Sequence, residues 1–283
     1  MEIKKVGVVG CGAMGGGIAQ LCAQSGYQVV ISEINDGFLK KGLAFIDKTL
    51  SRSVEKGKLS QPDKDAVMGR IKGTTATKDF ADCDLVIEAA IENLELKKKI
   101  FAELDGICLK HAILATNTSC LSIIDMAVAT KRPDKVLGLH FFNPAPVMKL
   151  LEIVKTIATS DEVVKMSQKF GESLGKTTVI AQDAPGFIVN RVWIPFLLHG
   201  IRLYEEGVAS REDIDNAIML GLNYPMGPLT LSDMVGIDVV KFVSDALYEQ
   251  LKDPRYITPT LVEKMVAAGW LGRKTGKGFY EYK

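Results

Sequence analysis

The chain has 283 residues, of which 47% are apolar and 24% are charged, an ordinary globular composition. Its 35 basic and 34 acidic side chains leave a formal charge of +1, so no bulk field favours nucleic acid or an anionic membrane. The five cysteines form no C-x-x-C pair, which argues against a disulfide framework and a zinc site. No signal-peptide pattern and no apolar run of about 18 residues occur, so we expect a soluble cytoplasmic protein without a metal, nucleic acid or membrane partner.

Short apolar runs alternate with helical segments along most of the chain. The expected strands are residues 3–9, 28–32, 84–88, 112–116, 136–140, 149–154 and 177–181, and the main helical segments are 13–25, 36–58, 93–108 and 161–174. This alternation predicts an α/β domain with a Rossmann-like, mostly parallel sheet over residues 1–183. Helical periodicity dominates afterwards, which predicts a smaller all-helical domain over residues 184–283. Asp183-Ala184-Pro185-Gly186 is typical of a helix start, with Asp183 as a possible cap.

A glycine-rich segment, Gly10-Cys11-Gly12-Ala13-Met14-Gly15, follows the first expected strand and begins a helix. The first glycine permits a tight turn, the second lets the backbone approach a pyrophosphate, and the third allows close packing of helix and strand. Glu33 lies about 20 residues further on, where an acid can hydrogen-bond the adenosine ribose and would repel a 2′-phosphate. We therefore expect NAD as cofactor, with NADP less favoured. The alternative is a glycine-rich turn beside an incidental surface acid.

His140 ends an apolar strand-like run, and Glu152 lies inside a second one, Leu150-Leu151-Glu152-Ile153-Val154. A glutamate is almost never buried alone, so Glu152 needs a partner. A histidine paired with a carboxylate is the usual arrangement of a general base. The alternative is a core histidine with an unrelated glutamate on an edge strand.

Other polar residues lie where ligands of open α/β sheets bind, beyond the carboxyl ends of strands. Asn117 and Ser119 follow one strand, and they could equally cap a helix that begins near Leu121. Asn190 falls on an apolar helical stripe and either ties its helix to the first domain or faces a ligand. The stripe consists of Phe187, Ile194, Leu197 and Ile201.

Three basic residues, Lys48, Arg52 and Lys56, recur every four positions and therefore share one helix face. A solvated face is the simpler interpretation. The alternative is an anchor for phosphates of the substrate.

Taken together, these segments resemble the 3-hydroxyacyl-CoA dehydrogenase family, and within it the short bacterial 3-hydroxybutyryl-CoA dehydrogenases. The resemblance spans the whole chain. Its landmarks are the glycine-rich segment, Glu33, Asn117-Thr118-Ser119, His140-Phe141-Phe142-Asn143-Pro144, Asp183-x-Pro185-Gly186-Phe187-x-x-Asn190-Arg191 and Gly276-x-Gly278-Phe279-Tyr280.

The resemblance implies an NAD-dependent enzyme that interconverts 3-hydroxyacyl-CoA and 3-ketoacyl-CoA. His140 would be the catalytic base, Glu152 would orient it, and Ser119 and Asn190 would contact the substrate. The residues implied for the cofactor, beside the glycine-rich segment and Glu33, are Glu92, Lys97, Asn117 and Lys274. The resemblance further implies that Thr49 and Lys56 contact coenzyme A. It also implies that the helical domain forms the contact between subunits of a homodimer or a higher homo-oligomer.

Three alternatives to this hypothesis use the same fold. The first is a dehydrogenase of a free hydroxy acid or sugar acid. The second is a nucleotide-sensing protein without catalysis, although a sensor needs only the glycine loop and not the polar set around His140. The third is a structural protein that reuses the fold.

Overall fold

The computed structural model describes residues 2–282 and divides into two compact units. The first unit runs to Ala184 and the second begins at Pro185, one residue after the boundary expected from the sequence. Within the described residues, the structure has no helix that is long and apolar enough to cross a membrane.

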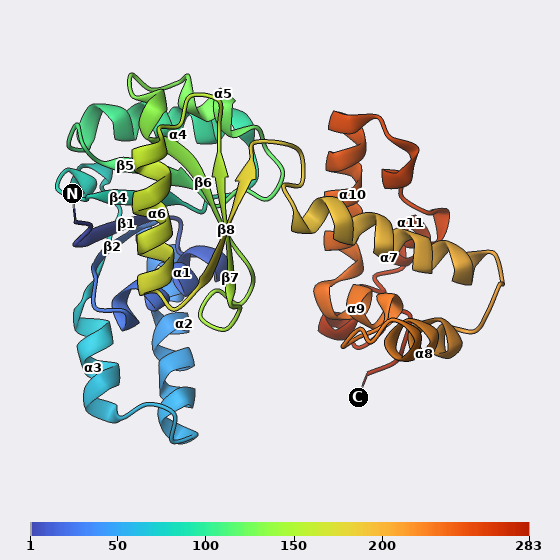
Figure 1. Ribbon diagram of the computed structural model, residues 1–283. Coiled ribbons are helices and arrows are strands. Elements are labelled where there is room, and N and C mark those ends of the chain that lie inside the picture. Colours follow the sequence, from blue (N-terminus) through green and yellow to red (C-terminus); the bar gives the residue numbers. More distant parts are fainter. Residues whose placement is uncertain (1, 283) are drawn as a thin grey trace. The chain divides into compact units, whose positions relative to one another are not determined.

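The first unit is built on one mixed sheet, mostly parallel, with the strand order β3-β2-β1-β4-β5-β6-β7-β8. Its strands are β1 Lys5–Val9, β2 Gln28–Ser32, β3 Ile71–Thr74, β4 Leu85–Glu88, β5 Ile113–Thr116, β6 Val136–Phe141, β7 Leu150–Lys155 and β8 Thr177–Gln182. Every neighbouring pair is parallel except β6 and β7. Together with the helices between the strands, this sheet confirms the predicted Rossmann-like fold class (Figure 1).

Helices cover both faces of the sheet because successive strand residues point to opposite sides. One apolar core joins the sheet to α1 Ala13–Gln24, α2 Asp36–Glu55, α3 Gln61–Gly69 and α6 Asp161–Ser173. The helices α4 Leu94–Ile107 and α5 Ile123–Ala127 contact each other, and α5 contacts β6. Short 3-10 segments occur at Thr77–Phe80 and Pro133–Lys135.

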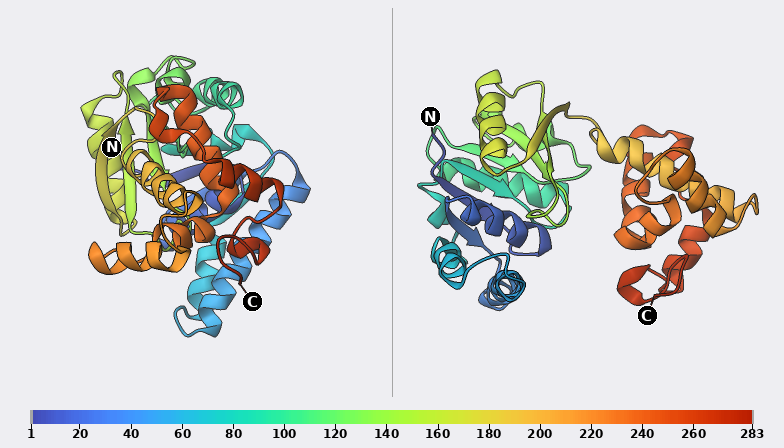
Figure 2. Two further views of the ribbon diagram at one scale, coloured as in Figure 1. Left: turned by 90° about the vertical axis from the view of Figure 1, so that its right-hand side faces the viewer. Right: turned by 60° about the horizontal axis from the view of Figure 1, so that its bottom comes forward.

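Two elements of the first unit were not expected from the sequence. The edge strand β3 contains Lys72 and Gly73, so it lacks the apolar run by which the other strands were found. The helix α3 has a weakly apolar sequence in which only Val67 is buried. It lies beside α2, and the pair extends away from the sheet in Figure 1 and in the left view of Figure 2.

The second unit contains α7 Val189–Glu205, α8 Arg211–Gly221, α9 Pro228–Val235, α10 Ile237–Leu251 and α11 Thr260–Ala267, with 3-10 segments at Pro254–Tyr256 and Arg273–Thr275. The predicted apolar stripe of α7 is buried at Ile194, Leu197 and Ile201. Two buried carboxylates bind the C-terminal segment. Asp233 accepts the backbone N–H groups of Phe279 and Tyr280, and Asp215 accepts the hydroxyl of Tyr280.

The expected role of Asp183 as the cap of the following helix was wrong. That helix begins only at Val189, after Gly186 and Phe187 with φ of +75° and +48°. Asp183 instead accepts the N–H groups of Ile123 and Ile124, at 3.1 and 2.7 Å, and so caps α5. Burial raises the pKa of Asp183, although these two hydrogen bonds act in the opposite direction.

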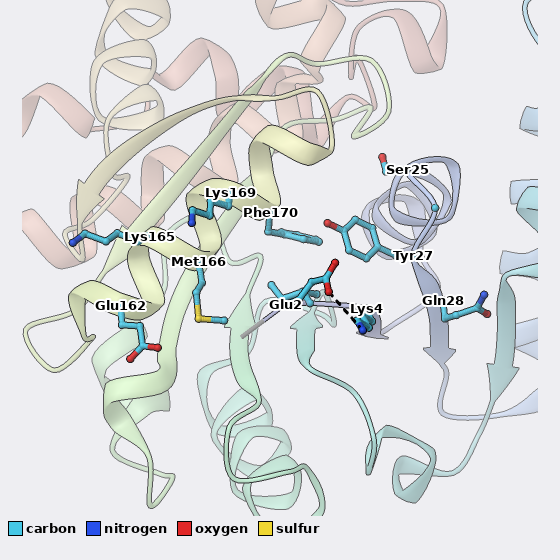
Figure 3. A pocket seen from close by; sticks show the side chains of 12 residues that line it. Glu2, Lys4, Ser25, Tyr27, Gln28, Glu162, Lys165, Met166, Lys169 and Phe170 are labelled. Carbon is cyan, nitrogen blue, oxygen red and sulfur yellow. Dashed lines mark ion pairs between the residues drawn. The ribbon is translucent and has the colours of Figure 1, made fainter.

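A hollow of about 980 Å³ lies at the amino edge of the sheet, opposite to the edge where the glycine-rich segment begins (Figure 3). The rings of Tyr27 and Phe170 meet there edge to face, with their centroids 5.3 Å apart. Lys165 and Lys169 of α6 line one side of it. None of the site residues expected from the sequence lines this hollow, so its size does not mark the chemistry.

Candidate active site

The glycine-rich segment forms the turn between β1 and α1. Gly10 has φ of +97°, and a Cβ there would lie 2.8 Å from the carbonyl oxygen of Ala89. A Cβ at Gly15 would lie 1.9 Å from the carbonyl oxygen of Gly10, so only glycine lets α1 begin so close to the strand. Both glycines are thus required by the backbone itself.

The middle glycine has the property that a phosphate-binding backbone needs. A Cβ at Gly12 would meet no described atom within 4 Å, so the space above this backbone is open to a ligand. Gly12 is also the N-cap residue of α1 and has no side chain to satisfy the first amides of the helix. A pyrophosphate can take those amides, and the residues present therefore fit a dinucleotide.

Glu33 lies directly beyond β2 and is held against the glycine-rich segment. Its Oε1 accepts the N–H of Cys11 at 2.9 Å, and its Oε2 accepts the N–H of Ile34 at 2.9 Å. Each carboxylate oxygen can accept a second hydrogen bond, so Glu33 retains acceptors for ribose hydroxyls. The carboxylate that is expected to bind the ribose is thereby held next to the turn that is expected to bind the pyrophosphate.

His140 and Glu152 form a buried pair, which excludes the alternative of two unrelated residues. They lie directly opposite each other in the antiparallel register of β6 and β7, so their side chains project from the same face. His140 Nδ1 lies 2.6 Å from Glu152 Oε2, and the two residues are 5% and 0% exposed. With Nδ1 hydrogen-bonded to the carboxylate, Nε2 is the nitrogen that can exchange a proton with a ligand.

Asn117 and Ser119 do not cap α5 through their side chains. The Asn117 Oδ1 accepts the N–H of Phe141 at 2.9 Å and so connects the end of β5 to the strand that carries His140. The N–H of Ser119 donates to Glu92 Oε1 at 2.9 Å. Both residues therefore lie at the carboxyl edge of the sheet, near the expected ligand site.

A buried group of charges at the ends of β4 and β5 was missed as a unit. We call Glu88, Glu92 and Lys97 the Glu88 cluster. Lys97 Nζ lies 2.6 Å from Glu88 Oε1 and 3.2 Å from Glu92 Oε2, and Lys97 and Glu88 are 1% and 0% exposed. This placement favours a role of Lys97 in orienting Glu92 over direct cofactor contact. The sequence did contain a signal for this buried charge, because Glu88 ends an apolar strand and so needs a partner, in the same way as Glu152 within its own apolar strand.

Glu92 connects the cluster to Ser119. Burial alone would raise the pKa of Glu92, but the Lys97 ammonium and the hydrogen bonds from Thr118 and Ser119 outweigh burial and lower this pKa. The neighbouring thiol of Cys120 behaves in the opposite way. Burial, followed by the Glu92 charge, raises the pKa of Cys120 to about 11, so the thiolate needed by a nucleophile is disfavoured.

The remaining predicted residues lie on α2 or in the second unit. Thr49 donates to the carbonyl of Phe45 at 2.9 Å, and Lys56 is exposed at the end of α2, as are Lys48 and Arg52 on its surface. Asn190 is 8% exposed on α7, and Lys274 Nζ binds Asp238 Oδ2 at 2.6 Å. The contacts of these residues with coenzyme A, substrate or cofactor stay predictions.

Comparison with known proteins decides the family. The model of the NAD binding domain of 3-hydroxyacyl-CoA dehydrogenase matches residues 5–184, and that of the C-terminal domain matches residues 186–282. The chain belongs to the 3-hydroxyacyl-CoA dehydrogenase family. It is therefore an NAD-dependent oxidoreductase that acts on a CHOH group, as the resemblance of its motifs predicted.

Several relatives are similar to the chain over their full length. A 3-hydroxybutyryl-CoA dehydrogenase of Mycobacterium tuberculosis is 45% identical, with 99% of each chain covered. One of Clostridioides difficile is 44% identical, with 98% of this chain and 99% of the relative covered. The crystal structure of (S)-3-hydroxybutyryl-CoA dehydrogenase from Ralstonia eutropha has a TM-score of 0.94 at 44% identity, with 100% of both chains covered.

The position of Glu33 predicts selective binding of NAD. In Glu33→Ala, we expect the Kd for NAD to rise about 10- to 100-fold, because charge-assisted hydrogen bonds to the ribose are lost. The Kd for NADP should rise far less, since the variant also loses the charge that repels a 2′-phosphate. Isothermal titration with both dinucleotides measures this, with the exposed Asp36→Ala as control. An equal loss for both cofactors would show that Glu33 does not distinguish them.

Proposed function

We propose that the protein is a (3S)-3-hydroxybutyryl-CoA dehydrogenase that interconverts 3-hydroxybutyryl-CoA and acetoacetyl-CoA with NAD(H). The observation that carries this proposal is the buried pair of His140 and Glu152 at 2.6 Å, on the same sheet as the glycine-rich segment. Relatives about 45% identical over their full length bear this name, which supports the substrate. The reaction belongs to short-chain fatty acid and butyrate metabolism.

Oxidation of the alcohol requires that a proton and a hydride leave the substrate together. In the proposed reaction, Nε2 of His140 accepts the proton of the 3-hydroxyl group while the C3–H bond breaks and the carbonyl forms. The bound nicotinamide supplies the acceptor for the hydride. In the reverse direction, His140 returns the proton to the carbonyl oxygen.

Glu152 has two effects on this proton transfer. Its hydrogen bond to Nδ1 fixes the ring orientation and the tautomer in which Nε2 can accept a proton. Its negative charge stabilises the imidazolium that forms, as a buried carboxylate does in a hydrolase triad. Glu152 is fully buried, so little solvent screens this interaction.

We assign the substrate contacts to Ser119 and Asn190. Ser119 is positioned by Glu92, and its hydroxyl lies 3.4 Å from Glu92 Oε1. Asn190 is a polar group on an otherwise buried helix face. Orientation of the hydroxyl and thioester oxygens is the expected contribution of both residues.

Coenzyme A is expected to bind near Thr49 and Lys56, for which the exposed basic surface of α2 provides support. We further propose that the second unit forms a homodimer contact. Large apolar side chains are exposed there, as at protein interfaces, and include Val192 (68%), Met234 (47%) and Phe242 (50%). The five free, buried cysteines fit a reducing cytoplasmic compartment.

The proposed substrate is tested by the decrease of reduced-nicotinamide absorbance. We expect rapid NADH oxidation with acetoacetyl-CoA, slow oxidation of NADPH, and little turnover with free acetoacetate. Turnover of the free acid at a comparable rate would favour a hydroxy-acid dehydrogenase. Binding of NADH without any turnover would instead favour a nucleotide sensor.

His140→Ala removes the group that exchanges the proton. We expect kcat to fall by at least about 10²- to 10⁴-fold, the usual contribution of general acid–base catalysis, while the Kd for NADH stays nearly unchanged. Steady-state kinetics and NADH titration measure the two quantities. The exposed His111→Ala is the matched control. Retention of most of the kcat in His140→Ala would remove His140 as the base.

Glu152→Gln keeps the shape and a hydrogen-bond acceptor for Nδ1 but removes the charge. We expect kcat to fall about 10- to 100-fold, because a hydrogen bond to a charged group is worth more than a neutral one. The Kd for NADH should change little, since Glu152 lies at the proton-transfer end. The exposed Glu162→Gln serves as control. An unchanged kcat would mean that the carboxylate does not stabilise the imidazolium.

A further inference from the structure

The Glu88 cluster carries one net negative charge inside the first unit. Every group that contacts the Glu88 carboxylate donates to it, namely Ala90 N at 2.6 Å, Lys97 Nζ at 2.6 Å and Thr116 Oγ1 at 2.7 Å. The Thr116 oxygen accepts the N–H of Thr118 at 3.1 Å, so its own proton is available to Glu88. An ionised carboxylate only accepts hydrogen bonds, which matches these three donors. The cluster thus contains two carboxylates and one ammonium.

The strand order places the cluster beneath the path of the cofactor. Glu33 follows β2, the glycine-rich segment follows β1, and His140 lies on β6, while β4 and β5 lie between β1 and β6. A dinucleotide that extends from Glu33 across the phosphate turn towards His140 therefore crosses the ends of β4 and β5. The turn itself touches this region, because Gly10 packs against the carbonyl of Ala89.

The cluster and the proton-transfer pair share one sheet face. Glu88 of β4 is the register partner of Thr116 in β5, which is the partner of Gly138 in β6. His140 lies two residues beyond Gly138 and so projects from the same face. Neighbouring strands are about 4.8 Å apart, which places the cluster on the order of 10 Å from His140. A nicotinamide ring bound beside His140 would lie at a similar distance from the cluster.

We propose that the Glu88 cluster sets the relative affinity of the site for oxidised and reduced cofactor, in favour of the oxidised form. The inference rests on the proposed dehydrogenase function. The oxidised nicotinamide ring is a cation and the reduced ring is neutral, so a buried negative charge stabilises only the former. At about 10 Å and an effective dielectric constant of about 20 to 40, one unit charge changes the ratio of affinities about 5- to 15-fold. The equilibrium between the enzyme-bound hydroxyacyl and ketoacyl substrates is thereby shifted towards the hydroxyacyl form with oxidised cofactor.

Two variants that change the cluster charge in opposite directions test this inference. Glu88→Gln removes the net charge, and the ratio of Kd for NAD⁺ to Kd for NADH should rise about 5- to 15-fold. Lys97→Met makes the net charge −2, and the ratio should fall by a similar factor. Glu95→Gln is the matched control on the same helix, because its side chain is 73% exposed and pairs with Lys98 at 2.9 Å. Isothermal titration without substrate measures both constants for each protein.

A purely structural role of the cluster gives a different result. It would weaken both nucleotides equally in Glu88→Gln and Lys97→Met, leave the ratio unchanged, and overturn the inference. Thermal melting identifies a variant that does not fold. In that case Glu92→Gln makes the same charge change at a side chain that is 19% exposed, and it should raise the ratio in the same way. If the unaltered protein binds neither nucleotide, the proposed function fails instead, which separates the two failures.

Discussion

The antiparallel pairing of β6 and β7 is the constraint on which the site depends. It places His140 directly opposite Glu152 within a single hairpin, whereas two parallel strands would need a crossover of a dozen or more residues between them. The loop of this hairpin is fixed from outside, because the ammonium of Lys176 donates to the carbonyls of Ala145 and Met148. Rigid strands and an anchored loop keep the imidazole and the carboxylate in one arrangement, as acid–base catalysis requires.

The features that the sequence could predict are those whose cause is local. The glycine-rich segment was recognisable because its spacing is dictated by one turn, and Glu152 because a carboxylate in an apolar run needs a partner. The short strand β3 and the helix α3 were missed because neither has a strong apolar pattern of its own. Asp183 was assigned to the wrong helix because its true partners, the amides of α5, are 60 and 59 residues away in the chain.

The Glu88 cluster shows a subtler limit. Asn117 and Ser119 were identified as candidates from their place after a strand, and Glu92 and Lys97 from the family resemblance, but sequence order does not say which polar groups are buried together. Lys97 lies in a helix where lysine is usually exposed, and only the structure shows that its Nζ is enclosed by two carboxylates. Long-range pairing of charges, unlike helix or strand periodicity, leaves no regular pattern in the sequence.

The proposed reaction moves a positive charge along the carboxyl edge of the sheet. Oxidation of the alcohol would give His140 a positive charge, while a bound nicotinamide would supply the hydride acceptor and lose its own positive charge. We propose that Glu152 stabilises the charge at the histidine and that the Glu88 cluster favours the cationic form of the bound ring. Because both negative groups project from one face of the same rigid sheet, their distances to the two ends cannot adjust independently. In this proposal, the strand register that assembles the site also sets the balance between oxidation and reduction.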